Sequence, residues 1–277
     1  MYSIVIPARY ASTRLPGKPL AQIDGKPMIE HVYQRASASA ASEVVVATDD
    51  PRVVAAVQGF GGIAVLTRAD HPSGTDRLNE VAELRAYADE HIVVNLQGDE
   101  PLMPVAVIEQ VASDIASAET AGIATLCEPI NSVDELLDPN VVKVVRSDEN
   151  MALYFSRAPV PFARDAAQLD MSPGEDNYRL SFKQQPLQQQ LQPRPDTSAA
   201  QSPWYRHIGL YAYRVAVLRQ FVSWPLAPAE ALEKLEQLRA LHNGVGIHCS
   251  EACQPVPAGV DTAADLQRVQ QAFAASH

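Results

Sequence analysis

The chain has 277 residues, a length that suits one large α/β domain with a sizeable hydrophobic core. Its formal net charge of −11 disfavours a nucleic-acid partner, because an acidic surface repels the phosphate backbone. No apolar run approaches the ~20 residues that span a bilayer, and the sequence opens on a predicted strand rather than a signal peptide, so we expect a cytoplasmic protein with no membrane partner.

Apolar runs of strand length alternate with helical patterns through the first 130 residues. The predicted strands lie at residues 2–6, 44–47, 63–66, 92–96 and 122–126, and the predicted helices at about 27–40, 50–58, 76–88 and 104–118. This alternation predicts an α/β fold with a mostly parallel sheet and helices on both faces. Ligands of such sheets lie beyond the carboxyl ends of the strands, where polar clusters follow several of these runs.

The pattern changes after residue 140. Strands are predicted at 141–146, 151–156, 208–213 and 246–251, and helices at 214–222, 228–242 and 263–275, the last with Thr262 as its N-cap. Residues 165–204 are rich in Gln and Pro and show no clear core periodicity, so we predict a surface insertion there. No internal repeat is visible, and residues 1–277 are expected to form a single domain.

The loop at residues 8–18 concentrates positive charge in an acidic chain. It carries Arg9, Arg14 and Lys18 around a Pro-Gly turn, but it matches neither a Walker motif nor a GxGxxG motif. Guanidinium groups bind phosphate oxygens in bidentate fashion, a lysine adds a point charge, and backbone amides near Ser12 add donors. We therefore predict a nucleoside triphosphate site here, with an exposed basic loop as the alternative.

Two aspartates are candidates for a magnesium site. Asp99 follows the strand 92–96, where a carboxylate beside a phosphate loop is placed to hold Mg²⁺, and an ordinary turn residue is the alternative. Asp261 lies in a turn before the last helix, and taken alone it is better explained as part of the start of that helix. Glu100 is a weaker candidate, since it could serve only to support the neighbouring Asp99.

The segment RADHPSGTDR, residues 68–77, combines small hydroxyl side chains with a glycine, which suits a backbone-lined pocket for a base. His71 could ligate a metal, but no companion His or Cys is spaced to help it, and a loop histidine is the preferred interpretation. The spacing of Cys127, Cys249 and Cys253 fits neither a metal site nor a redox pair, so we predict reduced thiols.

Two later segments are candidates for a polyol site. Strand alternation in RHIGLYAY puts a histidine, a glycine and two tyrosines on one face, at His207, Gly209, Tyr211 and Tyr213. In the predicted helix 228–242, helical spacing puts Glu233 on the same side as Glu236 or Gln237. The alternatives are a sheet face covered by helices and an exposed polar helix face.

The chain resembles the 3-deoxy-manno-octulosonate cytidylyltransferases, or CMP-Kdo synthetases. The matching motifs are PARYASTRLPGKPL (7–20), GKPMI (25–29), VATDD (46–50), TRADHPSGTDRLNEV (67–81), VNLQGDEP (94–101), NVVKVV (140–145), ALYFSRAPVP (152–161), RHIGLYAYR (206–214), LEQLR (235–239) and GVDT (259–262). This resemblance implies a Rossmann-like nucleotidyltransferase fold with a small dimerisation and sugar-binding lobe, and a homodimer. It also implies the conversion of CTP and Kdo to CMP-Kdo and diphosphate for lipopolysaccharide biosynthesis.

The resemblance assigns roles to individual residues. It implies catalytic roles for Arg14, Lys18, Asp99 and Asp261, with Mg²⁺ held by Asp99 and Asp261. The implied nucleotide-binding residues are Ala8, Arg9, Ser12, Arg14, Lys18, Asp70, Ser73, Arg77 and Gln97. The implied sugar-binding residues are Gln97, Arg157, His207, Tyr211, Glu236 and Gln237, with Arg157 as a fork-like partner for the sugar carboxylate.

Three other functions are considered. A cytidylyltransferase for a different sugar acid, such as a sialic acid, stays open because the segment 165–204 is longer than the family leads us to expect. A regulator that has lost catalysis is disfavoured by the presence of both Asp99 and Asp261. A glycosyltransferase would need an Asp-x-Asp pair after a strand, and Asp50-Pro51 is better explained as a helix start.

Overall fold

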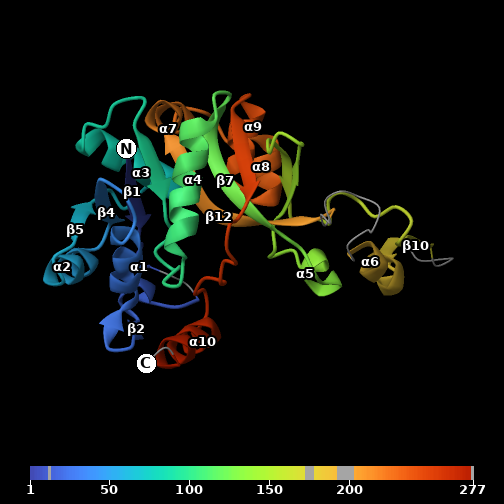
Figure 1. Ribbon diagram of the computed structural model, residues 1–277, viewed down its shortest axis with the longest axis horizontal. Coiled ribbons are helices and arrows are strands. Elements are labelled where there is room, and N and C mark those ends of the chain that lie inside the picture. The colour runs from blue at the N-terminus through green and yellow to red at the C-terminus, as the bar shows by residue number, and fades with distance from the viewer. Residues whose placement is uncertain (12–13, 172–177, 192–202, 276–277) are drawn as a thin grey trace.

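The computed structural model describes residues 1–11, 14–171, 178–191 and 203–275 (Figure 1). Over these residues the main sheet has nine strands: β1 (Tyr2–Pro7), β4 (Glu43–Thr48), β5 (Ile63–Leu66), β6 (Ile92–Asn95), β7 (Ala121–Pro129), β8 (Lys143–Arg146), β9 (Ala152–Ser156), β12 (Tyr205–Arg214) and β13 (Gly246–Glu251). Two small hairpins add β2 (Gln22–Ile23) with β3 (Lys26–Pro27), and β10 (Ala167–Met171) with β11 (Tyr178–Phe182). The helices are η1 (Lys18–Leu20, a 3-10 turn), α1 (Met28–Ser37), α2 (Pro51–Gly59), α3 (Gly74–Leu84), α4 (Val105–Ser117), α5 (Val133–Leu137), α6 (Gln184–Leu191), α7 (Val215–Phe221), α8 (Pro228–Glu233), α9 (Gln237–His242) and α10 (Ala263–Ala274).

The strands of the main sheet follow the order β13-β7-β12-β6-β1-β4-β5, and β8 joins β12 to β9. β1 pairs in parallel with β4 and β6, β4 with β5, and β7 with β13. Along this path only β12 runs in the opposite direction, because it is antiparallel to both β6 and β7. The predicted α/β class with a mostly parallel sheet is therefore confirmed.

The strand order of the sheet reverses between β1 and β6. From β1 it adds β4 and β5 on one side, and then returns to place β6 on the other side of β1. Two bonds carry the pairing past the strand ends, from Ala8 N to Ala47 O at 2.8 Å and from Leu96 N to Val5 O at 3.2 Å. The loops that follow β1 and β6 thus leave the same edge, at the kind of topological switch point where α/β sheets bind ligands.

Helices cover both faces of the sheet, as Figure 1 shows. Alternate side chains of β1 point to opposite faces, so Ile4 and Ile6 join one core cluster while Val5 joins the other. The first cluster contains Ile29 of α1 together with residues of α2 and α4, and the second contains Leu78 of α3 with residues of α7 and α9. Burial on both faces explains why these strands are continuous apolar runs.

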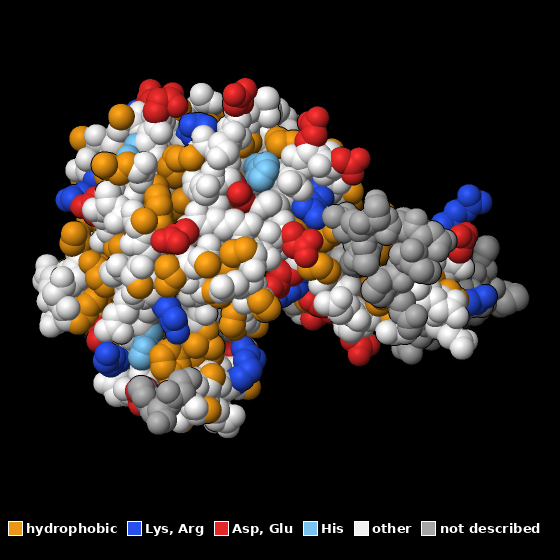
Figure 2. Space-filling view, viewed as in Figure 1, with side chains coloured by type: hydrophobic (Ala, Val, Ile, Leu, Met, Phe, Trp, Pro, Cys, Tyr) orange, Lys and Arg blue, Asp and Glu red, His pale blue; other side chains and the backbone are white. Residues whose placement is uncertain are grey.

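An arm made of α5, α6, β10 and β11 projects from the main body (Figures 1 and 2). The described part of the segment 165–204, which was predicted as a surface insertion, contributes to a small core of its own. Leu187 and Leu191 of α6 are buried with Leu136 of α5 and Trp204 in a separate small core. Four-residue spacing puts both leucines on one face of α6, but two apolar residues among glutamines are too few to reveal a periodicity in the sequence.

The predicted helix 228–242 is wrong as a single element. Lys234 adopts a left-handed backbone conformation, with φ 55° and ψ 46°, and separates α8 from α9. Glu233 thus lies in a different helix from Gln237, and its side chain accepts a bond from Ser156 Oγ at 2.6 Å. No helix in the portion of the chain described here is long and apolar enough to cross a membrane.

Candidate active site

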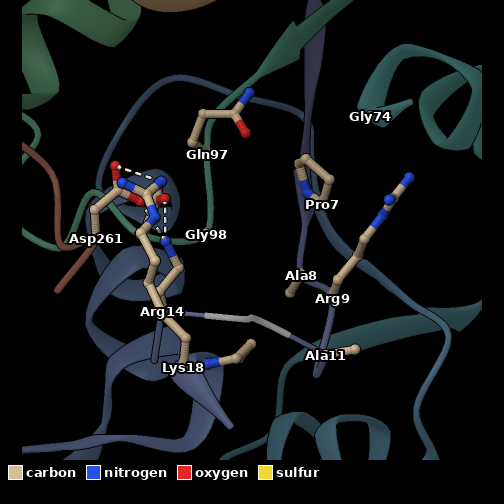
Figure 3. A pocket seen from close by; sticks show the side chains of 12 residues that line it. Pro7, Ala8, Arg9, Ala11, Arg14, Lys18, Gly74, Gln97, Gly98 and Asp261 are labelled. Carbon is tan, nitrogen blue, oxygen red and sulfur yellow. Dashed lines mark hydrogen bonds and ion pairs between the residues drawn. The ribbon is translucent and has the colours of Figure 1, made fainter. Parts of the chain in front are cut away.

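A cavity of about 370 Å³ opens where the loops after β1 and β6 meet. Figure 3 shows Arg9 on one wall, with Arg14, Lys18 and Asp261 grouped on the opposite wall. The cavity is lined by Pro7, Ala8, Arg9, Ala11, Arg14, Lys18, Pro19, Gly74, Gln97, Gly98, Asp99 and Asp261. Three cations thus surround an open space at the carboxyl edge of a parallel sheet, which is an arrangement suited to a polyphosphate.

The turn after the basic loop aims Lys18 into this cavity. Gly17 has a φ of 70°, in the left-handed region that favours glycine, and it directly precedes the 3-10 turn η1. A side chain at this position would also crowd Tyr10, because a Cβ placed there would lie 3.1 Å from the tyrosine hydroxyl. Pro19 follows Lys18 within η1 and is suited to the first turn of a helix.

Lys18 holds the two predicted metal-binding aspartates together. Its Nζ atom donates to Asp99 Oδ2 at 2.6 Å, to Asp261 Oδ1 at 3.0 Å and to the Val260 carbonyl at 2.9 Å. Burial lowers the pKa of Lys18, but its interactions with Asp99 and Asp261 outweigh burial, and the net shift is upward. Arg14 Nη2 lies 3.2 Å from Asp261 Oδ2 and adds a second positive charge.

The loop before α10 brings Asp261 to this position. Val260 N donates to Asp99 O at 2.8 Å, and a Cβ on Gly259 would lie only 3.2 Å from the same carbonyl oxygen. Thr262 caps α10 and exchanges hydrogen bonds with Asp265 in a capping box, which defines where the loop ends. Asp261 thus comes within reach of the same ammonium group as Asp99.

The residues at this point fit a magnesium ion. Asp99 and Asp261 already share one cationic group, the Lys18 ammonium, so their carboxylates are close enough to act on a single positive charge. Mg²⁺ is commonly held by one or two carboxylates together with substrate phosphates and water, so a larger group of protein ligands is not required. No cluster of three or more His, Cys, Asp or Glu suited to a metal is found over the described ranges.

The segment 68–77 reaches the cavity through its backbone rather than through the predicted side chains. Arg9 Nη2 donates to His71 O at 2.8 Å, and Gly74, the first residue of α3, lines the cavity. Ser73 caps α3 and its hydroxyl lies 2.6 Å from Asp76 Oδ2. The free N–H groups at the start of a helix are well suited to bind an anion.

Asp70 and Arg77 do not line this cavity. Asp70 is exposed and pairs with Arg68 at 3.0 Å. Arg77 is fully buried, where it contacts Thr67 and donates to Asp49 Oδ2 at 3.1 Å, so it joins the ends of β4 and β5. The predicted Ser12 lies outside the described residues.

A second cavity, of about 270 Å³, adjoins the first and shares Gln97 and Gly74 with it. It brings together most of the predicted sugar-binding residues, from elements far apart in the chain: Gln97, His207, Tyr211, Glu236 and Gln237. Gly209 and Tyr213, which lie on the predicted polyol face, also line it, and so do Thr75, Asn95 and Lys234, for which the sequence predicted no role in this site. Asn95 is a polar residue at the end of a buried apolar strand, and that was the available signal for it.

Burial controls the charge states in the second cavity. It lowers the pKa of His207 to about 3, so this imidazole is neutral near pH 7, and its Nε2 lies 2.9 Å from Thr125 Oγ1. Burial also raises the pKa of Glu236, whose carboxylate accepts a hydrogen bond from Thr75 at 2.9 Å. The pKa of Tyr211 is raised well above its usual value by burial, which keeps the hydroxyl protonated as a donor.

Arg157 is not among the residues that line either cavity. Its guanidinium donates to two backbone carbonyls, Glu233 O at 2.7 Å and Pro139 O at 2.9 Å. These bonds join β9 to the end of α8 and to the loop before β8. The structure therefore separates Arg157 from the other residues predicted to bind the sugar.

The chain matches proteins of known family along most of its length. A family model described as cytidylyltransferase matches residues 3–247. The 3-deoxy-manno-octulosonate cytidylyltransferase of Hahella chejuensis is 53% identical over 275 residues, covering 99% of this chain and 98% of that protein. The protein of the same name from Cellvibrio japonicus is 52% identical, covering 97% of this chain and 96% of that protein.

A solved structure of CMP:2-keto-3-deoxy-manno-octonic acid synthetase in complex with CTP superposes with a TM-score of 0.81. It is 42% identical in sequence, and the alignment covers all of both chains. A family of nucleotidyltransferases is consistent with the cationic cavity that the structure places at the switch point of the sheet. The chain therefore belongs to the cytidylyltransferase family, and it matches the 3-deoxy-manno-octulosonate cytidylyltransferases over nearly its full length.

Proposed function

We propose that this protein is a nucleotidyltransferase that couples CTP to 3-deoxy-D-manno-octulosonate (Kdo), releasing diphosphate, in lipopolysaccharide biosynthesis. One observation carries the proposal: a cationic cavity and a cavity lined by polar and aromatic side chains meet at Gln97 and Gly74. The first suits a triphosphate and the second suits a sugar, and their common wall is where the two substrates would react. The names of the relatives, at 53% and 52% identity, support the choice of substrates.

The reaction forms a bond between the anomeric oxygen of the sugar and the α-phosphorus of CTP, and breaks the bond from that phosphorus to the departing diphosphate. The proton of the anomeric hydroxyl is released to solvent or to the diphosphate. Arg14 and Lys18 reduce the negative charge on the triphosphate and stabilise the diphosphate as it leaves. Arg9 binds from the opposite wall, so the phosphate chain is held between Arg9 on one side and Arg14 with Lys18 on the other. The protein acts chiefly by positioning and charge neutralisation, as is usual in phosphoryl transfer.

Asp99 and Asp261 would hold Mg²⁺ in this proposal, and such an ion, when bound, polarises phosphate oxygens and lowers the pKa of a coordinated hydroxyl. The two aspartates bind the Lys18 ammonium in the structure described here. Lys18 is thereby held beside the place where the charge on the phosphates develops.

The proposal includes a homodimer in the cytoplasm. β9 pairs with β8 alone over the described residues, so it is an edge strand, and Leu153 and Tyr154 on it are 60% and 40% exposed. Leu232 of α8 is 86% exposed, and apolar groups of this size at the surface favour association. Cysteines that stay free, as Cys249 does, are typical of a reducing compartment.

The test is release of diphosphate from CTP and Mg²⁺ with either Kdo or a sialic acid, measured with a coupled assay. Release with Kdo and none with the sialic acid is the expected result. Release of diphosphate only with the sialic acid would show that the substrate is a sialic acid and not Kdo. No release with either acid would contradict the proposed enzyme, provided that a related cytidylyltransferase is active in the same assay.

A further inference from the structure

Lys234 lies at the junction of α8 and α9 and lines the second cavity. Its left-handed conformation, with φ 55° and ψ 46°, is one that residues other than Gly, Asn and Asp seldom adopt. A disfavoured conformation that persists beside a binding cavity is reason to look for a function of the residue that adopts it. This backbone turn places the lysine beside Leu235, Glu236 and Gln237, which line the same cavity.

The carboxylates next to Lys234 in sequence are engaged with other residues. Glu230 binds the Arg239 guanidinium at 2.5 Å and 2.8 Å, and Glu233 accepts a bond from Ser156 at 2.6 Å. Glu236 accepts a bond from Thr75 at 2.9 Å. The described residues provide no hydrogen bond or ion pair to the ammonium of Lys234, so its charge is available to a ligand.

Lys234 is also the sole formal cation on the wall of this cavity, judged over the residues that the structure describes. His207 does not replace it, because burial lowers the pKa of that imidazole to about 3 and leaves it uncharged. Arg157 does not replace it either, because its guanidinium donates to the carbonyls of Glu233 and Pro139. An anionic ligand in the cavity needs a counter-charge, and the exposed Lys234 is the lining residue that carries one.

We infer that Lys234 binds the carboxylate of the sugar acid and determines the preference of this cavity for an acidic sugar over a neutral one. The inference rests on the proposed function, because it concerns the second substrate of the same reaction. It differs from the role that family resemblance suggests for Arg157. In this inference Arg157 holds the α8–α9 junction in place, because it donates a hydrogen bond to the carbonyl of Glu233.

The test compares Lys234→Met and Lys234→Arg with the wild type. All three side chains carry a Cβ, so the backbone cost of the left-handed conformation is the same. We expect Lys234→Met to raise KM for Kdo about tenfold, the size of one charge-assisted hydrogen bond. KM for CTP should stay unchanged, and Lys234→Arg should stay within about twofold of the wild type for both substrates, since the charge is kept.

Two further measurements make the test specific. The carboxamide of Kdo, measured as an inhibitor of Kdo turnover, should bind the wild type and Lys234→Met equally, because it lacks the charge that the lysine binds. Lys26→Met, which removes an exposed lysine that lines neither cavity, should leave both KM values unchanged. A normal KM for Kdo in Lys234→Met, or an equal loss for acid and carboxamide, would overturn the inference. Absence of turnover in the wild type would instead contradict the proposed function.

Discussion

The backbone N–H of Val260 donates to the carbonyl oxygen of Asp99 at 2.8 Å, and this bond joins two loops that are far apart in the sequence. It places Asp261 beside Asp99, where Lys18 binds both carboxylates. Neither loop could form this pair of carboxylates alone, because Asp99 lies in the loop after β6 and Asp261 in the loop before α10. The candidate metal site thus depends on the docking of the C-terminal helix against the β2–β3 region, where Ile23, Met28, Val260 and Val269 form a small core.

Asp99→Asn should reduce turnover by roughly 10²–10³-fold, because it removes a carboxylate from the point where the phosphate charge is neutralised. Binding of CTP should weaken only modestly, since Arg9 and Arg14 remain. Diphosphate release gives the rate, and calorimetric titration of CTP gives the affinity. Asp148→Asn, at an exposed turn residue, serves as the control and should leave both unchanged. Turnover close to the wild-type value in Asp99→Asn would refute the role of this carboxylate.

Gly98→Ala should lower the free energy of unfolding and weaken the binding of CTP. A Cβ at this position would lie 2.9 Å from the carbonyl oxygen of Pro7, so the loops after β1 and β6 would have to separate. Overpacking of this kind costs about 1–3 kcal/mol of unfolding free energy. Urea denaturation measures the loss, and KM for CTP should rise with it. Gly59→Ala is the matched control, since a Cβ there meets nothing within 4 Å. Equal stability of the two variants would show that the approach of the loops is not tight.

Lys234→Gly should raise the unfolding free energy by about 1 kcal/mol, because glycine adopts the left-handed conformation without the steric cost. The same variant should lose affinity for Kdo, since the ammonium is removed. Ala86→Gly is the control: Ala86 follows α3 with a φ of 52°, and its replacement should stabilise the protein without changing KM. Chemical denaturation and KM for Kdo check the two effects separately. A less stable Lys234→Gly would contradict the account of backbone strain.

His207 should make stability depend on pH. Its pKa is lowered by burial to about 3, below the ordinary value of 6.5 for an unfolded chain, so the unfolded state binds more protons between these values. Stability is therefore present above pH 6.5 and is lost as pH falls, by at most about 1.4 kcal/mol per pH unit from this residue. Denaturation of wild type and His207→Gln between pH 5 and 7 should show a shallower dependence in the variant.

The control for that experiment is His242→Gln, which replaces an exposed histidine at the end of α9. Its pH dependence should match the wild type. If His207→Gln keeps the full wild-type slope, then the histidine is not buried in its neutral form.

Local patterns in the sequence were sufficient for much of the fold and for part of the site. The apolar runs predicted β1, β4 and β6 almost to the residue, because strands buried on both faces need no partner information to be recognised. β5 was predicted equally well from its apolar run, although it is a partly exposed edge strand. Ala8, Arg9, Arg14 and Lys18 were found for a similar reason, since one short loop carries them and a switch point follows β1.

Other features depend on contacts between distant segments. A buried guanidinium such as that of Arg77 has the same local sequence signal as an exposed one, and only packing between β4, β5 and α3 shows that it is fully enclosed. The small core of the arm was missed because Leu187 becomes buried only against α5 and Trp204.

The sequence by itself determined most strands and helices of the main sheet, the cationic loop and the resemblance to the family, because each is encoded in residues close together along the chain. The tertiary structure decided which charges meet: it joined Asp261 to Asp99, turned Arg157 to backbone carbonyls and left Lys234 as the cation of the second cavity. The physical reason is that the interaction between two charges depends on their distance in space. Loops that are far apart in the sequence reach that distance only when the whole sheet is assembled.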